Sequence, residues 1–561
     1  MRILRYCLLA VLPLAAALAQ DEAPPVDYSA AIDAARAAVR SQMTRWSTPG
    51  LAIAVVDRDR VVWSEAFGVT RAKSWEPVTT DTLFSLQSIS KHYTTLAFLR
   101  LAERGLVSLD DPISQAVPEF HINSRWPDED GRNMTFRQML SHHAGLAHET
   151  PIGNNLSTDY PSIEAHIDSI FRETWLRFRP GERYAYSNLG FDLTAYALER
   201  ITGKPIAQVL REEVFEPLGM SASTLDYLDT LSRPTATGHW GTTPAPRVQS
   251  PLPGSGAMYS TVTDMAKAIS MHLTGGMAGE TRFLSAESLA EMYRPQFLPE
   301  TYQFVGYALG TYTYYWNGSP DAPVYLHGGG GFGYRTDQGW MPKQGLGVAV
   351  LANNSDLDPD TLMNSVLDLF LRAKLGAPVP ASRPAIADLP AIPLSAAELA
   401  RFHGATFKGR GEVISFDARN GVLQMVRDSG RTTLTARSDT EFTTDDAVPL
   451  VWLIQRDDAG TPTVLTQLGF ESYFYNDRPG EPRGPNWNVW SRNAGTYRYD
   501  GPNGRCEWKF EMLNGYLYIW YGRWPVKLTE YTSGVFFTPD GDSVVFRSGY
   551  AIVFGDVMYR R

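Results

Sequence analysis

The stretch Phe84-Ser85-Leu86-Gln87-Ser88-Ile89-Ser90-Lys91-His92 contains a Ser-x-x-Lys pattern at the start of a predicted helix. Residues three apart share one face of a helix, so the hydroxyl of Ser88 and the amine of Lys91 can meet. The helix dipole favours negative charge on Ser88 and disfavours a protonated Lys91, and burial acts on the amine in the same direction. The pattern therefore predicts an activated nucleophile that needs no catalytic histidine. The alternative is a capped helix with an exposed lysine.

A turn-rich segment, residues 180–190, places Tyr186 and Asn188 just before another predicted helix. A phenol held near a lysine can act as a base or an acid, and an asparagine amide can bind a substrate carbonyl. Tyr315-Trp316-Asn317 matches the same short pattern, but it lies in a strand-like run where alternating side chains explain it as packing. We therefore predict a functional role for Tyr186 and a structural role for Tyr315.

A third segment is rich in glycine: Leu326-His327-Gly328-Gly329-Gly330-Gly331-Phe332-Gly333-Tyr334. Four consecutive glycines destabilise any regular element, so their place beside a predicted strand indicates a close approach of the backbone to a ligand. A backbone N–H presented there could pair with that of Ser88 as an oxyanion hole. The alternative is a flexible glycine loop.

Around these segments the hydrophobic pattern predicts an α+β domain over residues 28–375. Two β-rich runs with a charged turn between them predict an N-terminal hairpin, helical spacing follows, and strand-like runs return before a last helix. This order suggests a sheet that joins both ends of the segment. The predicted hairpin strands are 51–56 and 61–67, the helices 92–106, 191–202, 260–273 and 359–375, and the later strands 307–316, 337–341 and 345–352.

Residues 376–395 hold five prolines among small residues, which predicts an extended linker and a domain boundary. Beyond the linker the pattern is β throughout and occurs twice, with 402–407 resembling 494–497 and an Asn-Gly pair in each copy. We predict two small barrel-like β modules, residues 396–490 and 491–561. Chance similarity between β segments is the alternative.

The first residues are typical of a secretory signal peptide, which we predict over residues 1–19. Arg2 and Arg5 precede the apolar run 8–14, and Ala17-Leu18-Ala19 resembles a cleavage site. The predicted location is therefore outside the bacterial cytoplasm, in the periplasm or secreted. The alternative is an uncleaved anchor; no other segment has the ~18 apolar residues that a membrane span needs.

Composition excludes several functional classes. With 51 Lys and Arg against 61 Asp and Glu, the net charge is −10 and no basic block attracts nucleic acid. Of the two cysteines, Cys7 lies in the predicted signal peptide and Cys506 has no second cysteine to pair with, so a disulfide scaffold is excluded. His142, His143 and His148 lack the spacing of a zinc helix, and we predict no metal site. Neither a cofactor nor an oligomeric state is indicated.

The three motifs follow one another along the chain. Ser88-x-x-Lys91, Tyr186-x-Asn188 and His327-x-Gly329, in this order, resemble the penicillin-recognising serine hydrolases. The resemblance is to the branch of class C β-lactamases, DD-carboxypeptidases, D-aminopeptidases and related esterases. Three further stretches resemble the same branch, and the two C-terminal modules look most like the barrels of its D-aminopeptidases. These stretches are 138–146, 216–220 and 256–261.

The resemblance implies a helical subdomain packed on an antiparallel sheet, with the site between them. It implies that Ser88 is acylated and that Lys91 and Tyr186 move protons. It further implies that Asn188 orients the substrate and that the N–H groups of Ser88 and Gly330 hold the oxyanion.

One departure from the family pattern concerns the substrate. His327 stands where β-lactamases and DD-peptidases of this type usually have a lysine, and a histidine is mostly neutral at pH 7. The position resembles that of D-aminopeptidase and esterase members. In the second half of the chain, Asp477 could reach the active site from a β module and meet a substrate ammonium; an ordinary strand end is the alternative.

These observations predict a hydrolase that acts on small molecules or short peptides through an acyl-enzyme, most like a D-aminopeptidase. A promiscuous carboxylesterase, or a weak β-lactamase or DD-carboxypeptidase, is the alternative within the same chemistry. A catalytically idle protein that binds D-peptides or wall fragments is the alternative from another class.

Overall fold

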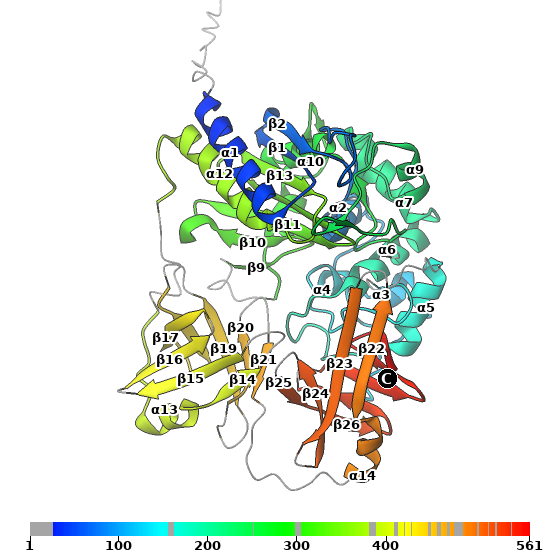
Figure 1. Cartoon of the computed structure of the whole chain (residues 1–561), viewed down its shortest axis with the longest axis vertical. Coiled ribbons are helices and arrows are strands. Elements are labelled where there is room, and N and C mark those ends of the chain that lie inside the picture. The colour runs from blue at the N-terminus through cyan, green and yellow to red at the C-terminus, as the bar shows by residue number, and fades with distance from the viewer. Residues whose placement is uncertain are drawn as a thin grey trace, which may run out of the picture.

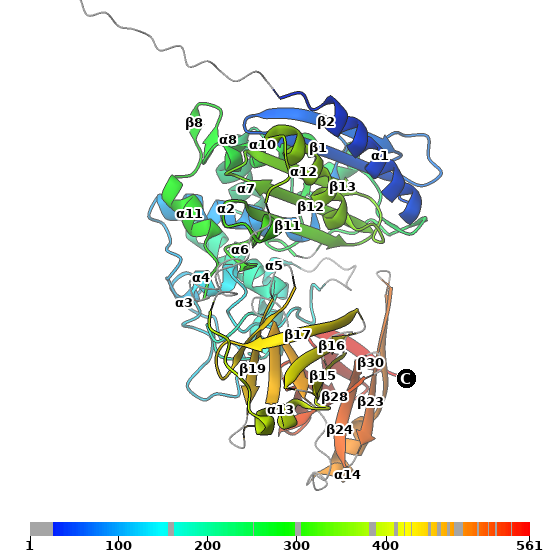
Figure 2. The same ribbon diagram turned by 90° about the vertical axis from the view of Figure 1, so that its left-hand side faces the viewer.

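The computed structural model describes residues 26–561 except 155–161, 251, 298–304, 381–388 and short stretches in the C-terminal half. The predicted signal peptide and Asp477 therefore lie outside the described residues. A sheet-and-helix region is followed by two all-β modules, which lie on the same side of it in two perpendicular views (Figure 1, Figure 2). The short stretches are 409–412, 420, 428, 447–449, 457–459, 461, 468–471, 476–485, 502–503, 514, 522–523 and 540.

The first region is built on a seven-stranded antiparallel sheet with the strand order β2-β1-β13-β12-β11-β10-β9. β1 pairs with both β2 and β13, which confirms that the sheet joins the N-terminal hairpin to the last predicted strand. The strands are β1 (Gly50–Asp57), β2 (Arg60–Gly68), β9 (Val305–Tyr307), β10 (Tyr312–Tyr315), β11 (Pro323–Gly331), β12 (Tyr334–Met341) and β13 (Leu346–Ala352).

The four predicted helices are present as α2, α6, α10 and α12, with small shifts at their ends. Their starts follow capping rules: the side chain of Thr261 accepts the N–H of Asp264 at α10, and that of Asp358 accepts the N–H of Thr361 at α12. The helices of this region are α1 (Ser29–Trp46), α2 (Ser90–Glu103), α3 (Ile113–Ala116), α4 (Phe136–Leu140), α5 (Ile163–Glu173), α6 (Asn188–Thr202), α7 (Ile206–Leu210), α8 (Glu216–Leu218), α9 (Tyr227–Ser232), α10 (Val262–Leu273), α11 (Ala286–Tyr293) and α12 (Pro359–Leu375).

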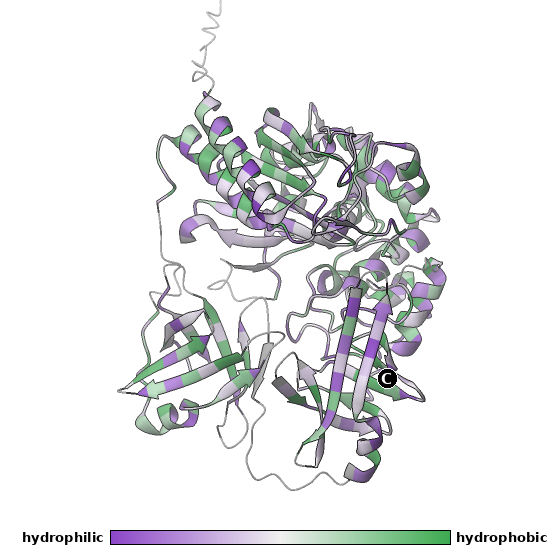
Figure 3. Cartoon of the chain, in the orientation of Figure 1, coloured by the Kyte–Doolittle hydropathy of each residue, from purple (hydrophilic) through white to green (hydrophobic). Residues whose placement is uncertain are grey.

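Helices cover both faces of the sheet, which explains why β1 is buried along its whole length. Because alternate side chains of a strand point to opposite faces, Ala52 and Ala54 join the core with α2 and α10, whereas Leu51 and Ile53 join the core with α1 and α12. Hydropathy colouring shows α1 and α12 as mixed helices rather than uniformly apolar ones (Figure 3). None of the helices that the structure describes is long and apolar enough to cross a membrane.

The first β module is a closed barrel, in which no strand edge is left open. Phe407, Phe416 and Trp452 are buried in its core. A short helix, α13 (Ala396–Phe402), precedes it. Its strands are β14 (Thr406–Lys408), β15 (Val413–Arg419), β16 (Val422–Arg427), β17 (Gly430–Ala436), β18 (Glu441–Thr444), β19 (Val451–Arg456), β20 (Pro462–Gln467) and β21 (Ser472–Tyr475).

The last module is a nine-stranded antiparallel sheet, preceded in the same way by a short helix, α14 (Trp487–Trp490). Its two edge strands, β25 and β26, are separated in the chain by Leu528 alone, so the sheet is nearly closed. Two barrel-like modules are thus confirmed. The strands are β22 (Gly495–Gly501), β23 (Gly504–Leu513), β24 (Tyr516–Tyr521), β25 (Trp524–Lys527), β26 (Thr529–Thr532), β27 (Val535–Phe537), β28 (Ser543–Arg547), β29 (Tyr550–Val553) and β30 (Asp556–Arg560).

Candidate active site

Ser88 lies in a single 3₁₀ turn, Gln87–Ile89, that leads directly into α2. The preceding residue, Gln87, has φ +52°, in the left-handed region that non-glycine residues rarely adopt. Such backbone strain is typical of functional sites. Ser88 is partly exposed, whereas Lys91, one turn further along α2, is completely buried. A partly exposed serine thus lies beside a buried lysine.

Three oxygen atoms surround the amine of Lys91: the Oγ of Ser88 at 3.1 Å, the Oδ1 of Asn188 at 2.7 Å and the carbonyl of Ser255 at 3.0 Å. Burial lowers the pKa of Lys91 to about 7, although the nearby carboxyls of Asp192 and Glu149 act in the opposite direction. A neutral amine has only two N–H groups and one lone pair. If it donates to Asn188 and Ser255, its lone pair faces the hydroxyl of Ser88, so it can take the proton of that hydroxyl.

Tyr186 is brought to the same point by the loop before α6. The amine of Lys91 lies 4.8 Å from the centre of its ring, and the Ser88 hydroxyl is a hydrogen-bond partner of its phenol. Burial raises the pKa of Tyr186 well above its usual value, against the effect of that hydrogen bond. The phenol is therefore protonated at neutral pH and can act as an acid.

Asn188, the first residue of α6, connects the lysine to a buried acid. Its Oδ1 accepts from Lys91, and its Nδ2 donates to the Oε1 of Glu149 at 2.7 Å. The structure thus brings together Ser88, Lys91, Tyr186 and Asn188, which the sequence places in two separate segments.

The glycine-rich segment forms the end of β11 and lies against the turn that carries the nucleophile. A Cβ on Gly329 would be 2.0 Å from the carbonyl oxygen of Leu86, and one on Gly331 would be 2.6 Å from the Oε1 of Gln87. We predicted that the backbone of this segment approaches a ligand. At Gly329 and Gly331 it instead approaches the residues just before Ser88. Gly330 lies between them on β11.

His327 is buried in β11 with both ring nitrogens hydrogen-bonded. Its Nδ1 lies 2.7 Å from the carbonyl of Gly328, which only accepts, so Nδ1 carries the proton. Its Nε2 must then accept from the phenol of Tyr307 at 2.9 Å. Burial and the nearby Lys91 lower the pKa of His327 to about 3. The ring therefore supplies no positive charge at neutral pH.

The sequence prediction missed Glu149, Asp192 and Ser255, which act on the site through contacts between distant segments. Asp192 accepts the N–H groups of Gly254 and Ser255 at 3.0 Å each and so fixes the carbonyl that holds Lys91. Glu149 follows the family-like stretch 138–146 by three residues, which is the one signal that could have identified it. In the part of the chain that the structure describes, no cluster of His, Cys, Asp and Glu could hold a metal ion.

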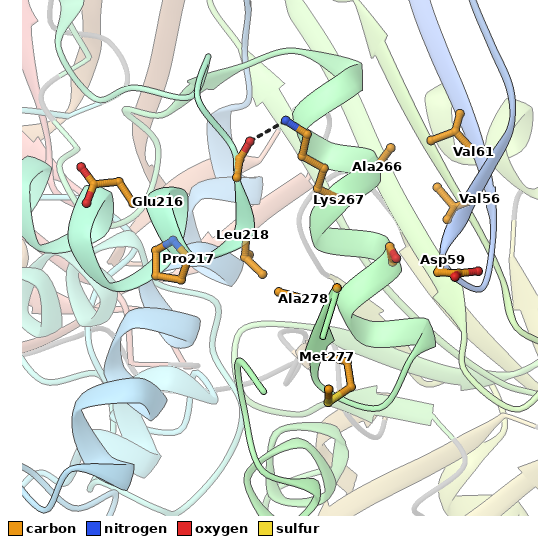
Figure 4. A pocket seen from close by; sticks show the side chains of 13 residues that line it. Val56, Asp59, Val61, Glu216, Pro217, Leu218, Ala266, Lys267, Met277 and Ala278 are labelled. Carbon is orange, nitrogen blue, oxygen red and sulfur yellow. Dashed lines mark hydrogen bonds between the residues drawn. The ribbon is translucent and has the colours of Figure 1, made fainter. Parts of the chain in front are cut away.

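A groove of about 420 Å³ lies elsewhere, between α8, α10 and the β1–β2 turn. Pro217 lines it from α8, Lys267 from α10 and Asp59 from the β1–β2 turn (Figure 4). The predicted site residues do not line this groove. The candidate active site is therefore the junction of α2, the α6 N-terminus and β11.

Comparison with known proteins agrees with this geometry. A family model described as beta-lactamase matches residues 35–372, which is more than half of the chain. The chain belongs to the beta-lactamase family. Members of this family are serine hydrolases, and the match covers Ser88, Tyr186 and His327.

Two known proteins are similar to this chain at nearly the same sequence identity. Unguisins hydrolase ungD' of Aspergillus campestris is 29% identical over 359 residues, which are 60% of this chain and 63% of that protein. The D-alanyl-D-alanine-carboxypeptidase/endopeptidase AmpH of Escherichia coli K12 is 27% identical over 314 residues, 55% of this chain and 80% of that protein. The solved structure of SurE with D-Leu has a TM-score of 0.54 at 21% identity and covers 80% of this chain and 99% of that chain, so the likeness is one of fold.

Proposed function

We propose that this chain is an exported serine hydrolase that forms an acyl-enzyme at Ser88 on small amides or esters, with D-aminopeptidase-like specificity. The 3.1 Å contact between the buried amine of Lys91 and the hydroxyl of Ser88 is the observation that supports this most directly. The signal-like residues 1–19 support export. The shared fold with SurE, solved with D-Leu, and the two β modules support substrates that contain a D-residue.

Acylation begins when the Oγ of Ser88 attacks the substrate carbonyl carbon and its proton passes to the lone pair of Lys91. The carbonyl oxygen gains the electron pair and accepts hydrogen bonds from the backbone N–H groups of Ser88 and Gly330. Asn188 holds Lys91 in place and orients the substrate. Tyr186 passes a proton to the leaving nitrogen or oxygen, and the bond to the acyl carbon breaks.

Deacylation repeats these steps with water as the nucleophile. Water attacks the acyl carbon and loses a proton to Tyr186, which gave up its own proton during acylation. The ester bond to Ser88 then breaks, and its Oγ takes back the proton that Lys91 carries. The acid product leaves, and the site returns to its starting protonation state.

His327 determines which substrates fit this proposal. Because its ring is neutral and both nitrogens are occupied, His327 supplies no fixed positive charge that would hold a substrate carboxylate. We therefore expect slower turnover of β-lactams and D-alanyl-D-alanine peptides than of aminoacyl amides and esters. The same observation favours the second candidate, a promiscuous carboxylesterase.

The test compares turnover of D-alanyl p-nitroanilide and p-nitrophenyl acetate by the wild type and by Ser88→Ala. We expect the wild type to hydrolyse both and Ser88→Ala to lose about 10³-fold or more in kcat. Full turnover by Ser88→Ala would contradict the proposal. Turnover of the acetate alone would identify the esterase, and binding of a D-peptide without any turnover would identify the idle binding protein.

A further inference from the structure

The turn between β29 and β30 of the last module lies directly against the backbone of Glu149, the buried acid that contacts Asn188. Gly555 in this turn has φ +99°, and a Cβ there would lie 2.0 Å from the carbonyl oxygen and 2.4 Å from the carbonyl carbon of Glu149. Side chains do not approach backbone this closely, so only glycine allows the contact. The turn therefore packs against the backbone of Glu149.

Glu149 is three contacts away from the nucleophile. Its Oε1 accepts from the Nδ2 of Asn188 at 2.7 Å, the Oδ1 of Asn188 accepts from Lys91 at 2.7 Å, and Lys91 lies 3.1 Å from the Oγ of Ser88. The side chain of Glu149 is buried, so it cannot shift without moving its neighbours. A displacement of the Glu149 backbone is expected to move Asn188 and loosen the lysine.

The turn also contributes a charge. Glu149 is faced by Asp556 from β30, Asp192 from α6 and Lys91 from α2, and the ring of His148 lies 3.3 Å away. Burial and, after it, the charge of Asp556 raise the pKa of Glu149 well above its usual value, and an ionised Glu149 would raise the pKa of Lys91. Asp556 therefore favours a protonated Glu149 and, through it, a neutral Lys91.

Separate contacts fix the position of the module. Arg177 forms an ion pair with Asp542 at 2.7 Å, with both side chains largely buried, and the ring of Trp175 packs edge-on against Phe537 with 5.8 Å between centres. A Cβ on Gly541 would lie 1.9 Å from the carbonyl oxygen of Arg177. Because these contacts hold the module from β27 and the turn between β27 and β28, the β29–β30 turn has a defined place against Glu149.

We propose that the last β module is a working part of the active site, in which the turn Phe554-Gly555-Asp556 positions Glu149 and thereby Asn188 and Lys91. The inference rests on the proposed acyl-enzyme function, because it concerns the same site. It gives the module a role in the rate of acylation, and the residues of the turn act through Glu149 without touching substrate.

The test compares Gly555→Ala with Gly549→Ala in the full chain. Gly549 also has a positive φ, +86°, but a Cβ there would meet no atom within 4 Å. Both variants therefore carry a similar backbone strain, and only Gly555→Ala collides with Glu149. We expect Gly555→Ala to lower kcat/KM for p-nitrophenyl acetate by about tenfold or more, and Gly549→Ala to stay within about twofold of the wild type. Equal rates for the two variants would overturn the proposal.

Asp556→Asn tests the same coupling without added volume, and it decides the question if Gly555→Ala does not fold. Loss of the Asp556 charge lowers the pKa of Glu149, so that Glu149 ionises more readily. Because an ionised Glu149 raises the pKa of Lys91, the rise of kcat/KM on the acid side of the pH profile (its acid limb) moves to higher pH. We expect a shift of about half a pH unit. If Asp556→Asn has its acid limb at the same pH as the wild type, the electrostatic coupling is wrong, because a purely structural role of Asp556 would not move the acid limb.

The two proposals fail in different ways. If the wild type neither turns over an ester nor acylates Ser88, the proposed function is wrong, and the coupling is wrong with it. In the other case the wild type is active, Gly555→Ala and Gly549→Ala have equal rates, and Asp556→Asn has its acid limb at the wild-type pH. Only the coupling is then wrong.

Discussion

The chemistry of the site depends on how single residues surround Lys91. Desolvation disfavours its ammonium form, and Asn188 and Ser255 accept its N–H groups, which leaves the lone pair of the neutral amine for Ser88. A lysine with a pKa near 7 is free of its proton in about half of the molecules at neutral pH, and it is still strong enough to accept one.

The first prediction concerns the pH dependence of acylation. Because protonated Lys91 has no lone pair, kcat/KM is expected to rise about tenfold per pH unit below pH 7 and to level off above it. Lys91→Arg, which stays protonated, is expected to lose about 10³-fold or more at all these pH values. Initial rates on p-nitrophenyl acetate between about pH 5 and about pH 9 measure both effects. A flat wild-type profile would show that Lys91 is not the base.

The second prediction concerns His142, whose Nδ1 accepts the N–H of Ser187 at 3.0 Å and whose ring lies 4.1 Å from that of Tyr186. His142 has φ +62°, which asparagine tolerates, and an asparagine oxygen can replace Nδ1 as the acceptor. We expect His142→Asn to keep kcat within about fivefold, whereas His142→Leu, which leaves the N–H of Ser187 without an acceptor, loses about 10²-fold. Measured kcat values for the two variants provide the check, and wild-type kcat in His142→Leu would disprove this positioning role.

Those helices and strands whose apolar residues follow a regular local spacing could be predicted from the sequence. The helix over residues 359–375 appears with the same bounds, and the hairpin of β1 and β2 appears where the charged turn at 57–60 indicates it. The motif residues of α2 and the α6 N-terminus were identified for the same reason. Glu149 and Ser255 act through contacts between segments distant in the sequence, which no local pattern encodes. The pattern also treated the two β modules as copies, although one closes into a barrel and the other has nine strands.

The third prediction tests why β11 ends in glycines. A methyl group on Gly329 would collide with the carbonyl of Leu86, whereas one on Gly328 would have its nearest contact at 3.5 Å. We expect Gly329→Ala to lose about 10²-fold in kcat/KM because the nucleophile turn must shift, and Gly328→Ala to stay within about threefold. Rates and thermal unfolding of both variants measure this. Similar activities in the two variants would mean that the close approach does not position Ser88.

At the scale of the whole molecule, the last module is attached to the helical side of the first region by a mainly apolar contact around a buried ion pair. Val535, Phe537, Val545 and Ile552 form a small core with the half-buried Trp175. The module and the first region are therefore expected to unfold together.

The fourth prediction concerns this attachment. Asp542→Ala removes the carboxylate that pairs with the largely buried Arg177 and is expected to cost about 3 kcal/mol. Lys343→Ala removes an exposed pair with Asp321 and should cost less than about 1 kcal/mol. Thermal unfolding and limited proteolysis report the difference. Equal stability of the two variants would show that the ion pair does not hold the module.

If its surroundings activate Ser88, this serine reacts with a fluorophosphonate. Intact-mass spectrometry after exposure to the reagent, in parallel with Ser88→Ala, measures the reaction. We expect one adduct on the wild type and none on Ser88→Ala. No adduct on either protein, or an adduct that persists in Ser88→Ala, would show that Ser88 is not an activated nucleophile.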